Sequence, residues 1–156
     1  MNLAENLART AKEYPDNVAM KLDDAELTYE QLDGAASRVA NLLAAKGIEP
    51  GDRVGIMLPN VPYFPAVYYG ILRLGAVVVP MNVLLKKREV GFYLSDPEAK
   101  ALFAWHDFAE AAEAGAAEAG TELILVKPGE FEQLVGEQSD EFELVERDDD
   151  DTAVIL

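Results

Sequence analysis

The sequence predicts an α/β fold with a mostly parallel sheet and helices on both faces. The main observation is a strand-like run, Arg53–Leu58, followed by the nearly charge-free segment Val61–Leu74 and the β-branched run Ala76–Val79. Apolar residues recur at helical spacing in the middle segment, which predicts a buried helix between two fully buried strands. Further strand and helix patterns alternate after it, and this alternation is typical of parallel sheets with crossover connections.

The region before the first buried strand predicts a helix and a hairpin. Asn2 and Glu5 have the spacing of a capping box, so the first helix is expected to begin there. Its apolar stripe would consist of Leu3, Leu7 and Ala11. Two short strands, Val18–Leu22 and Ala25–Leu27, then flank a turn at Asp23-Asp24.

The second helix carries clear signals at both ends. Thr28 and Gln31 have capping-box spacing, and Leu27 and Leu32 occupy the two positions of a hydrophobic staple. Gly47 is placed to end the helix in a left-handed turn. The buried face would consist of Leu32, Ala35, Ala36, Val39, Leu42 and Leu43.

The buried helix after Arg53–Leu58 is expected to have Asn60 as its cap, and to start late or kink at Pro65. Gly75 is predicted to end it in a left-handed conformation. The remaining expected elements are a helix near Lys86–Ser95, a strand Ala101–Trp105, a surface helix Phe108–Ala119 capped by Asp107, a strand Glu122–Val126, a helical turn Phe131–Val135 and a final strand Thr152–Leu156.

Composition excludes several classes of function. The formal net charge is −16, and residues 137–156 hold nine acidic residues against Arg147 alone, a run best interpreted as a solvated loop. Such a chain repels nucleic acid and anionic membranes. It contains no cysteine, so disulfides and thiol chemistry are excluded. The longest apolar region, Ile71–Leu85, is interrupted and too short to span a bilayer, and Met1–Tyr14 has an acidic amphipathic helix pattern in place of the basic-then-apolar pattern of a signal peptide. A cytoplasmic location is expected.

The sequence contains few candidates for chemistry. No phosphate-binding GxxxxGK[ST], GxGxxG or GxSxG motif occurs. His106 is the only histidine and lies at a predicted strand end, where ligands bind in parallel sheets. One imidazole can form neither a metal site nor a triad, so a loop histidine is the preferred interpretation. Asp148–Asp151 lacks the spacing of a calcium loop.

Two further clusters have a functional and a structural interpretation. Lys86-Lys87-Arg88 could meet an anion such as a phosphate, although a solvated or partner-facing surface is preferred. Four aromatic residues in the buried helix could line an acyl pocket, but a core or subunit interface is the commoner use of such residues. These residues are Tyr63, Phe64, Tyr68 and Tyr69.

Three segments resemble the adenylate-forming enzymes, the superfamily of acyl-CoA synthetases, luciferases and peptide-synthetase adenylation domains. Gly70–Asp96 (GILRLGAVVVPMNVLLKKREVGFYLSD) resembles their second core motif, and Leu27–Asp33 (LTYEQLD) resembles the first. Asp149–Leu156 is similar to the lead-in to their phosphate-binding loop. The resemblance implies that residues 1–156 form an incomplete N-terminal part of a larger adenylate-forming domain. Residues 1–50 would supply a helix, hairpin and capped helix, 51–130 a β-α-β core, and 131–156 an acidic segment and truncated strand.

The resemblance implies a parent enzyme that binds ATP with Mg²⁺, activates a carboxylate as an acyl-adenylate and transfers the acyl group to coenzyme A. In that family the nucleotide-binding motifs lie downstream of position 156. No catalytic, cofactor-binding or metal residue is therefore assigned in this chain, no cofactor is expected in it, and on its own it is expected to be inactive.

The expected substrate class also rests on the resemblance. Pro80-Met81-Asn82 followed by Leu84-Leu85-Lys86 resembles fatty-acid or aryl-acid CoA ligases, with a fatty acid preferred. A peptide-synthetase adenylation fragment and a flavodoxin-like, non-catalytic binding module remain as alternatives. The expected partners are the remainder of the parent enzyme, a small carboxylic acid, and a second copy bound through Val61–Leu74 and the final strand.

Overall fold

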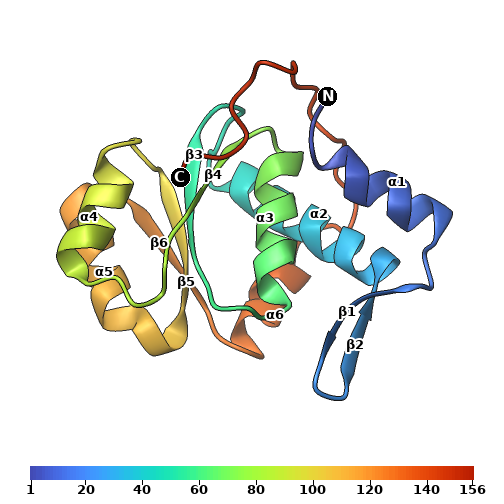
Figure 1. Cartoon of the computed structure of the whole chain (residues 1–156), viewed down its shortest axis with the longest axis horizontal. Coiled ribbons are helices and arrows are strands. Elements are labelled where there is room, and N and C mark those ends of the chain that lie inside the picture. The colour runs from blue at the N-terminus through green and yellow to red at the C-terminus, as the bar shows by residue number, and fades with distance from the viewer.

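A four-stranded parallel sheet forms the centre of the structure, a computed structural model that describes residues 1–156 (Figure 1). The strand order is β4-β3-β5-β6, and β3 pairs in parallel with both β4 and β5. The bounds are Arg53–Met57 for β3, Val77–Pro80 for β4, Ala101–Trp105 for β5 and Glu122–Val126 for β6. The predicted parallel sheet is therefore confirmed.

Helices cover both faces of this sheet, as expected. One face packs against α2 (Tyr29–Ala45), α3 (Tyr63–Arg73) and α6 (Glu130–Gly136). The other packs against α4 (Lys87–Ser95) and α5 (Ala109–Ala119). Successive strand residues point to opposite faces. Strands that are buried on both faces need apolar residues at nearly every position, which explains their continuous hydrophobic runs.

The N-terminal helix α1 (Glu5–Glu13) and the antiparallel hairpin of β1 (Val18–Leu22) and β2 (Ala25–Thr28) lie beside this layered core. The hairpin extends from the end of the molecule opposite to both termini (Figure 1). It leads into α2, whose predicted capping box is present. The Thr28 hydroxyl accepts a hydrogen bond from the Gln31 backbone at 3.2 Å, and the Gln31 side chain accepts one from the Thr28 backbone at 2.9 Å.

Both predicted glycine helix ends are confirmed. Gly47 has φ +82° and Gly75 has φ +83°. After α3, the Gly75 backbone donates to the Leu72 carbonyl at 2.9 Å and the Ala76 backbone to the Ile71 carbonyl at 3.1 Å. This pair of bonds is the Schellman arrangement, which satisfies carbonyls that a helix end would otherwise leave free.

These two glycines allow the cost of backbone strain to be separated from the cost of steric contact with neighbouring side chains. A Cβ at Gly47 would meet nothing within 4 Å, whereas one at Gly75 would lie 3.0 Å from Val145 and 3.2 Å from Pro50. We expect Gly47→Ala to cost about 1 kcal/mol of unfolding free energy through its left-handed backbone alone. Gly75→Ala should cost about 1–2 kcal/mol more through overpacking. Urea unfolding of both variants measures the difference, and equal losses would contradict the close packing at Gly75.

The structure corrects the predicted start of α1. Asn2 does not form a capping box with Glu5: its side chain is buried, and its amide donates to the carbonyls of Leu72 at 2.7 Å and Val145 at 2.8 Å. Leu3 was expected on the apolar stripe, but it is 40% exposed. The cause is a set of tertiary contacts. Asn2 connects the N-terminus to α3 and to the acidic segment, and α1 begins only at Glu5.

Three other predicted details are also wrong. Asn60 does not cap α3, since Pro62 stands at the N-cap without a side-chain bond and Pro65 lies in the first turn. Asp107 does not cap α5, which follows a short 3₁₀ turn at His106–Phe108. The predicted strand Thr152–Leu156 is reduced to one bridge between Val154 and Val78. In each case the local sequence was compatible with the predicted cap or strand, but the backbone adopts a different conformation at that position.

The helix predicted as a surface helix, α5, is only partly one. Ala112, Gly115 and Ala116 are buried on its inner side, and a Cβ at Gly115 would lie 2.5 Å from Val90 of α4. The two helices therefore pack closely.

No helix combines the length and apolar character that a membrane span requires.

The acidic segment, residues 137–156, is solvated only on its charged side. All nine of its acidic side chains are exposed, as expected of a solvated run. Its backbone, however, is held by α2: Asn41 donates to the carbonyls of Ser139 and Glu141 at 2.9 Å. Phe142 and Leu144 are half-buried against the core. In this segment, apolar side chains that pack against the core therefore alternate with acidic side chains exposed to solvent.

Candidate functional site

An apolar pocket of about 520 Å³ opens at the carboxyl edge of the sheet. Its walls come from the hairpin, α2, α3, α6, the loops that follow β3 and β6, and the last residue of β5. Ten of its thirteen lining residues are hydrophobic, so the pocket suits an apolar group. Ligands of open α/β sheets bind outside the carboxyl ends of the strands, and this pocket occupies that position.

Aromatic rings form one wall of the pocket. Tyr63 lies between Trp105 and Phe131, with ring centroids 5.9 Å and 5.8 Å away, respectively. Phe131 in turn packs edge-on against Phe103 of the buried sheet, at 6.2 Å. These contacts connect the pocket to the core, so the wall is held in place before any ligand arrives.

The pocket has one polar group pair at its rim. The Tyr63 hydroxyl donates to one carboxylate oxygen of Glu132, and the Gly129 backbone donates to the other. Burial, assisted by this hydrogen bond and by the negative charge of Glu132, raises the pKa of Tyr63 to about 12. Tyr63 therefore remains a neutral donor at physiological pH, and the rim carries the charge of one carboxylate.

The aromatic cluster predicted in α3 is divided by the structure. Tyr63 lines the pocket, whereas Phe64, Tyr68 and Tyr69 are half-buried and pack against the core. Burial raises the pKa of Tyr68, and neighbouring Tyr69 adds to that shift. Trp105 and Glu132 were not singled out from the sequence. The position of Trp105 at the end of a predicted parallel strand was the only available signal.

The sole histidine lies close to this edge but does not line the pocket. The His106 ring packs against Trp105 with centroids 4.7 Å apart, and its Nδ1 lies 3.3 Å from the Asp107 carboxylate. Asp107 also accepts a hydrogen bond from the Trp105 indole at 3.3 Å. The three side chains form a local surface cluster, and no group of three His, Cys, Asp or Glu side chains in the chain could hold a metal ion.

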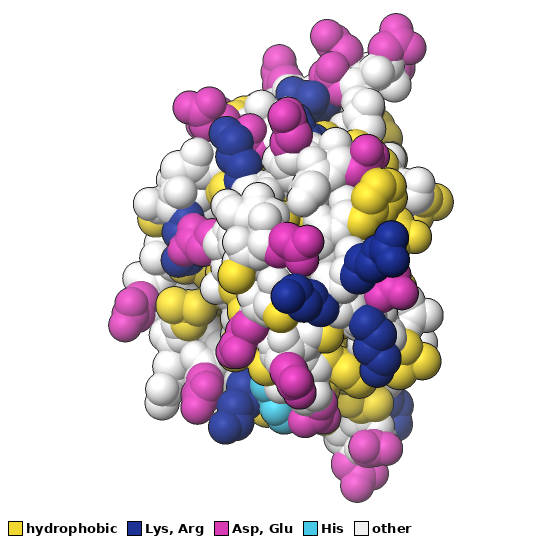
Figure 2. All heavy atoms as spheres, turned by 90° about the vertical axis from the view of Figure 1, so that its left-hand side faces the viewer, with side chains coloured by type: hydrophobic (Ala, Val, Ile, Leu, Met, Phe, Trp, Pro, Cys, Tyr) yellow, Lys and Arg dark blue, Asp and Glu magenta, His cyan; other side chains and the backbone are white.

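The basic run Lys86-Lys87-Arg88 lies elsewhere, at the start of α4 on the opposite face of the sheet. All three side chains are exposed and none forms an ion pair. The Glu89 carboxylate accepts a hydrogen bond from the Lys86 backbone at 2.9 Å, which places a negative charge at the positive end of the helix dipole. Figure 2 shows this side of the molecule, where Lys and Arg side chains lie among acidic ones.

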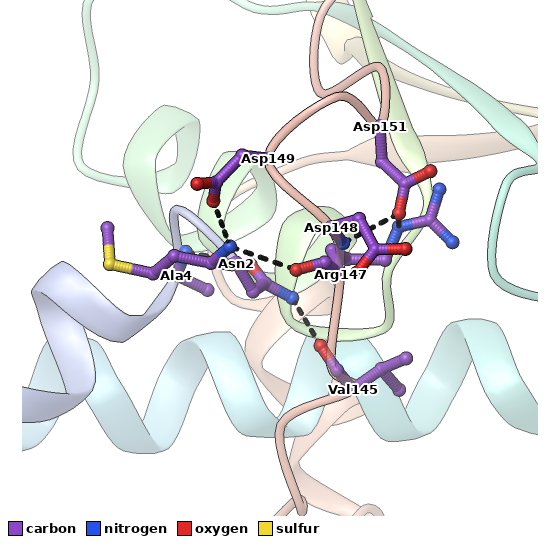
Figure 3. A network of polar contacts seen from close by, with 8 residues as sticks. Asn2, Ala4, Val145, Arg147, Asp148, Asp149 and Asp151 are labelled. Atoms are coloured by element: carbon purple, nitrogen blue, oxygen red, sulfur yellow. Dashed lines mark hydrogen bonds and ion pairs between the residues drawn. The ribbon is translucent and has the colours of Figure 1, made fainter.

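The Asp148–Asp151 run lies at the amino edge of the sheet and takes part in a polar network with the N-terminus (Figure 3). The Met1 ammonium lies 2.5 Å from Asp149, and this contact raises the pKa of the amine and lowers that of the carboxyl group. Asp151 pairs with Arg147 at 3.3 Å and accepts a hydrogen bond from the Asp148 backbone at 2.8 Å. Through Asp149, the acidic segment is therefore bound to the N-terminus of the chain.

Two of the motif-like segments meet through an ion pair whose cation is buried. Asp33 ends the segment Leu27–Asp33, and Arg73 lies within the segment Gly70–Asp96. The Arg73 guanidinium, whose side chain is 4% exposed, donates to the Asp33 carboxylate and to the Ser37 hydroxyl. The fold thus joins two of the three segments on which the family resemblance rests.

Comparison with known families decides the assignment. The family model for AMP-binding enzymes matches residues 7–156. The chain belongs to the AMP-binding enzyme family. This assignment replaces the flavodoxin-like module as a family, although the strand order of the sheet is compatible with either.

Curated relatives of this AMP-binding chain include acyl-CoA ligases. It is 46% identical over 77 residues to the long-chain-fatty-acid–CoA ligase FadD13 of Mycobacterium tuberculosis. The matched residues make up 49% of the chain and 15% of that ligase. It is 35% identical over 132 residues to a feruloyl-CoA synthase of an Amycolatopsis species, covering 85% of the chain and 26% of the synthase.

The fold agrees with a solved structure. The N-terminal domain of FACL13 from Mycobacterium tuberculosis superposes with a TM-score of 0.89 at 32% identity, and covers 99% of the chain and 41% of that domain. The AMP-binding chain therefore spans less than half the length of each of these three proteins.

Proposed function

We propose that this chain forms the N-terminal part of an ATP-dependent acyl-CoA ligase. Such an enzyme converts a carboxylic acid, ATP and coenzyme A into acyl-CoA, AMP and pyrophosphate. The observation that carries the proposal is the family match over residues 7–156, and the Asp33–Arg73 pair that joins the two motif-like segments supports it.

The proposed substrate is a fatty acid, with an aryl acid as the second candidate. FadD13 is described as a long-chain-fatty-acid ligase and the Amycolatopsis relative as a feruloyl-CoA synthase, so the relatives include both classes. The apolar lining of the carboxyl-edge pocket is compatible with either tail. ATP, Mg²⁺ and coenzyme A are the proposed cofactors and co-substrate of the parent enzyme, and the remainder of that enzyme is the proposed partner of this chain.

The test is an AMP-release assay on the full-length product of the coding sequence that contains this chain. The substrates are straight-chain acids from acetate to palmitate, together with aromatic acids and amino acids. Each methylene that enters an apolar site contributes about 0.8 kcal/mol, so kcat/KM should rise with chain length and fall once the site is full.

The controls separate the substrate class from the activity itself. AMP release confined to amino acids would move the protein to the peptide-synthetase branch, and no AMP from any acid would overturn the ligase proposal. Residues 1–156 assayed alone are expected to release no AMP and to exchange no pyrophosphate into ATP. Measurable exchange by residues 1–156 would contradict the expectation that this part is inactive on its own.

A further inference from the structure

The carboxyl-edge pocket combines an apolar interior with a single fixed charge. Its interior is formed by aliphatic side chains and by the rings of Tyr63, Trp105 and Phe131. The only charged lining residue is Glu132. A ligand that enters therefore gains from burying apolar surface and meets a negative charge at the rim.

The charge of Glu132 is held in place from two sides. One oxygen accepts the Tyr63 hydroxyl and the other accepts the backbone N–H of Gly129 at the start of α6. No cation of the chain pairs with this carboxylate, since the Lys127 side chain, at 3.6 Å, pairs with Glu130 instead. The negative charge at the pocket is thus positioned and uncompensated.

We propose that this pocket binds the uncharged apolar end of an alkyl or aryl compound, and that Glu132 acts as a specificity-determining residue that excludes ligands with a negative charge at that end. A monocarboxylate enters tail-first and leaves its own carboxylate in solvent. A dicarboxylate has no uncharged end and must bring one anion to Glu132. Binding of this kind needs no ATP or coenzyme A, so it extends beyond the proposed ligase reaction.

The only tryptophan of the chain makes the proposal directly testable. Trp105 lines the pocket, so a ligand bound there changes its fluorescence, whereas a ligand on a remote surface does not. Residues 1–156 are titrated with octanol, octanoate and octanedioate without nucleotide. We expect saturable changes with octanol and octanoate, and binding of octanedioate about tenfold weaker than that of octanoate.

Two variants and a control assign the effect to named residues. Glu132→Gln removes the charge; its amide oxygen can accept from the Gly129 backbone while its amide nitrogen donates to the Tyr63 hydroxyl, so the side chain stays held from both sides. The variant should reduce the preference for octanoate over octanedioate to within about twofold. Ala35→Phe narrows the pocket from α2 and should abolish all three signals, while the exposed Ala45→Phe in the same helix should preserve them. Circular dichroism of each variant checks that it is folded.

Several outcomes would overturn the proposal. They are the absence of a saturable signal with octanol and octanoate, equal binding of octanoate and octanedioate to the unmodified chain, or unchanged binding in a folded Ala35→Phe variant. None of these results depends on AMP release, so failure of this inference and failure of the ligase proposal are distinguishable.

Discussion

Asp33→Ala should lower the free energy of unfolding by about 2–3 kcal/mol, more than any exposed substitution in this chain. The Arg73 side chain is 4% exposed, and Asp33 supplies the only negative charge that pairs with it. Removing one partner of a buried pair leaves the other charge uncompensated, which costs about 3–5 kcal/mol for full burial. The expected value is lower here because the Asp33 side chain is 31% exposed and water can enter.

The opposite single variant should be milder. Arg73→Met removes the buried charge and keeps an apolar chain of similar length, so only Asp33 loses its partner, and it can be hydrated. The Nε atom of Arg73 is buried without a hydrogen-bond partner, which is destabilising, and methionine has no such donor. We therefore expect Asp33→Ala combined with Arg73→Met to be at least as stable as Asp33→Ala alone.

Urea unfolding of the two single variants and the double variant measures the coupling between these residues. The exposed Lys21–Glu26 pair provides the control, and Glu26→Ala should change stability by at most about 0.5 kcal/mol. If Asp33→Ala were no more damaging than Glu26→Ala, the buried pair would not hold the two motif segments together.

Gly70→Ala should destabilise the chain by about 1–3 kcal/mol, although a glycine-to-alanine change inside a helix normally stabilises by up to about 1 kcal/mol. The reason is the close contact between α3 and α2. A Cβ at Gly70 would lie 2.5 Å from Cγ1 of Val39 and 2.9 Å from the backbone oxygen of Ala36. A backbone oxygen in the middle of a helix cannot move aside without displacing the helix.

A second helical glycine provides the matched control. Gly34 lies in α2, and a Cβ there would have its nearest neighbour at 3.7 Å, an ordinary contact with Asp140. Gly34→Ala should therefore raise stability by about 0.5–1 kcal/mol. Thermal and urea unfolding of both variants should change in opposite directions. A gain in stability for both variants would be incompatible with the close approach of α2 and α3.

The elements predicted with the correct bounds are those whose signals lie within a few consecutive residues. Strands β5 and β6 match the predicted ranges, because fully buried strands need an unbroken apolar run. The Thr28–Gln31 capping box and the left-handed turns at Gly47 and Gly75 were also predicted correctly. Each depends on a hydrogen bond or a backbone angle within about one helical turn, so the local sequence is sufficient.

The sequence was insufficient wherever a polar side chain could choose between a local and a distant partner. Asn2 had a local capping option, yet it binds backbone carbonyls of α3 and of the acidic segment. Asp107 had one too, yet it contacts Trp105 and His106. The energies of these alternatives differ by about 1 kcal/mol or less, so packing decides between them.

By itself, the sequence determined the α/β class, the order of its elements and the family resemblance, because these depend on periodicity, caps and contiguous motifs. Only the tertiary structure decided that Asp33 pairs with Arg73, and that Tyr63, Trp105 and Glu132 meet around one pocket. These residues come from different elements, and no local pattern records their distance. The three pocket residues meet because parallel strands bring the chain segments that follow them to the same edge of the sheet, whereas Asp33 and Arg73 meet because α2 packs against α3.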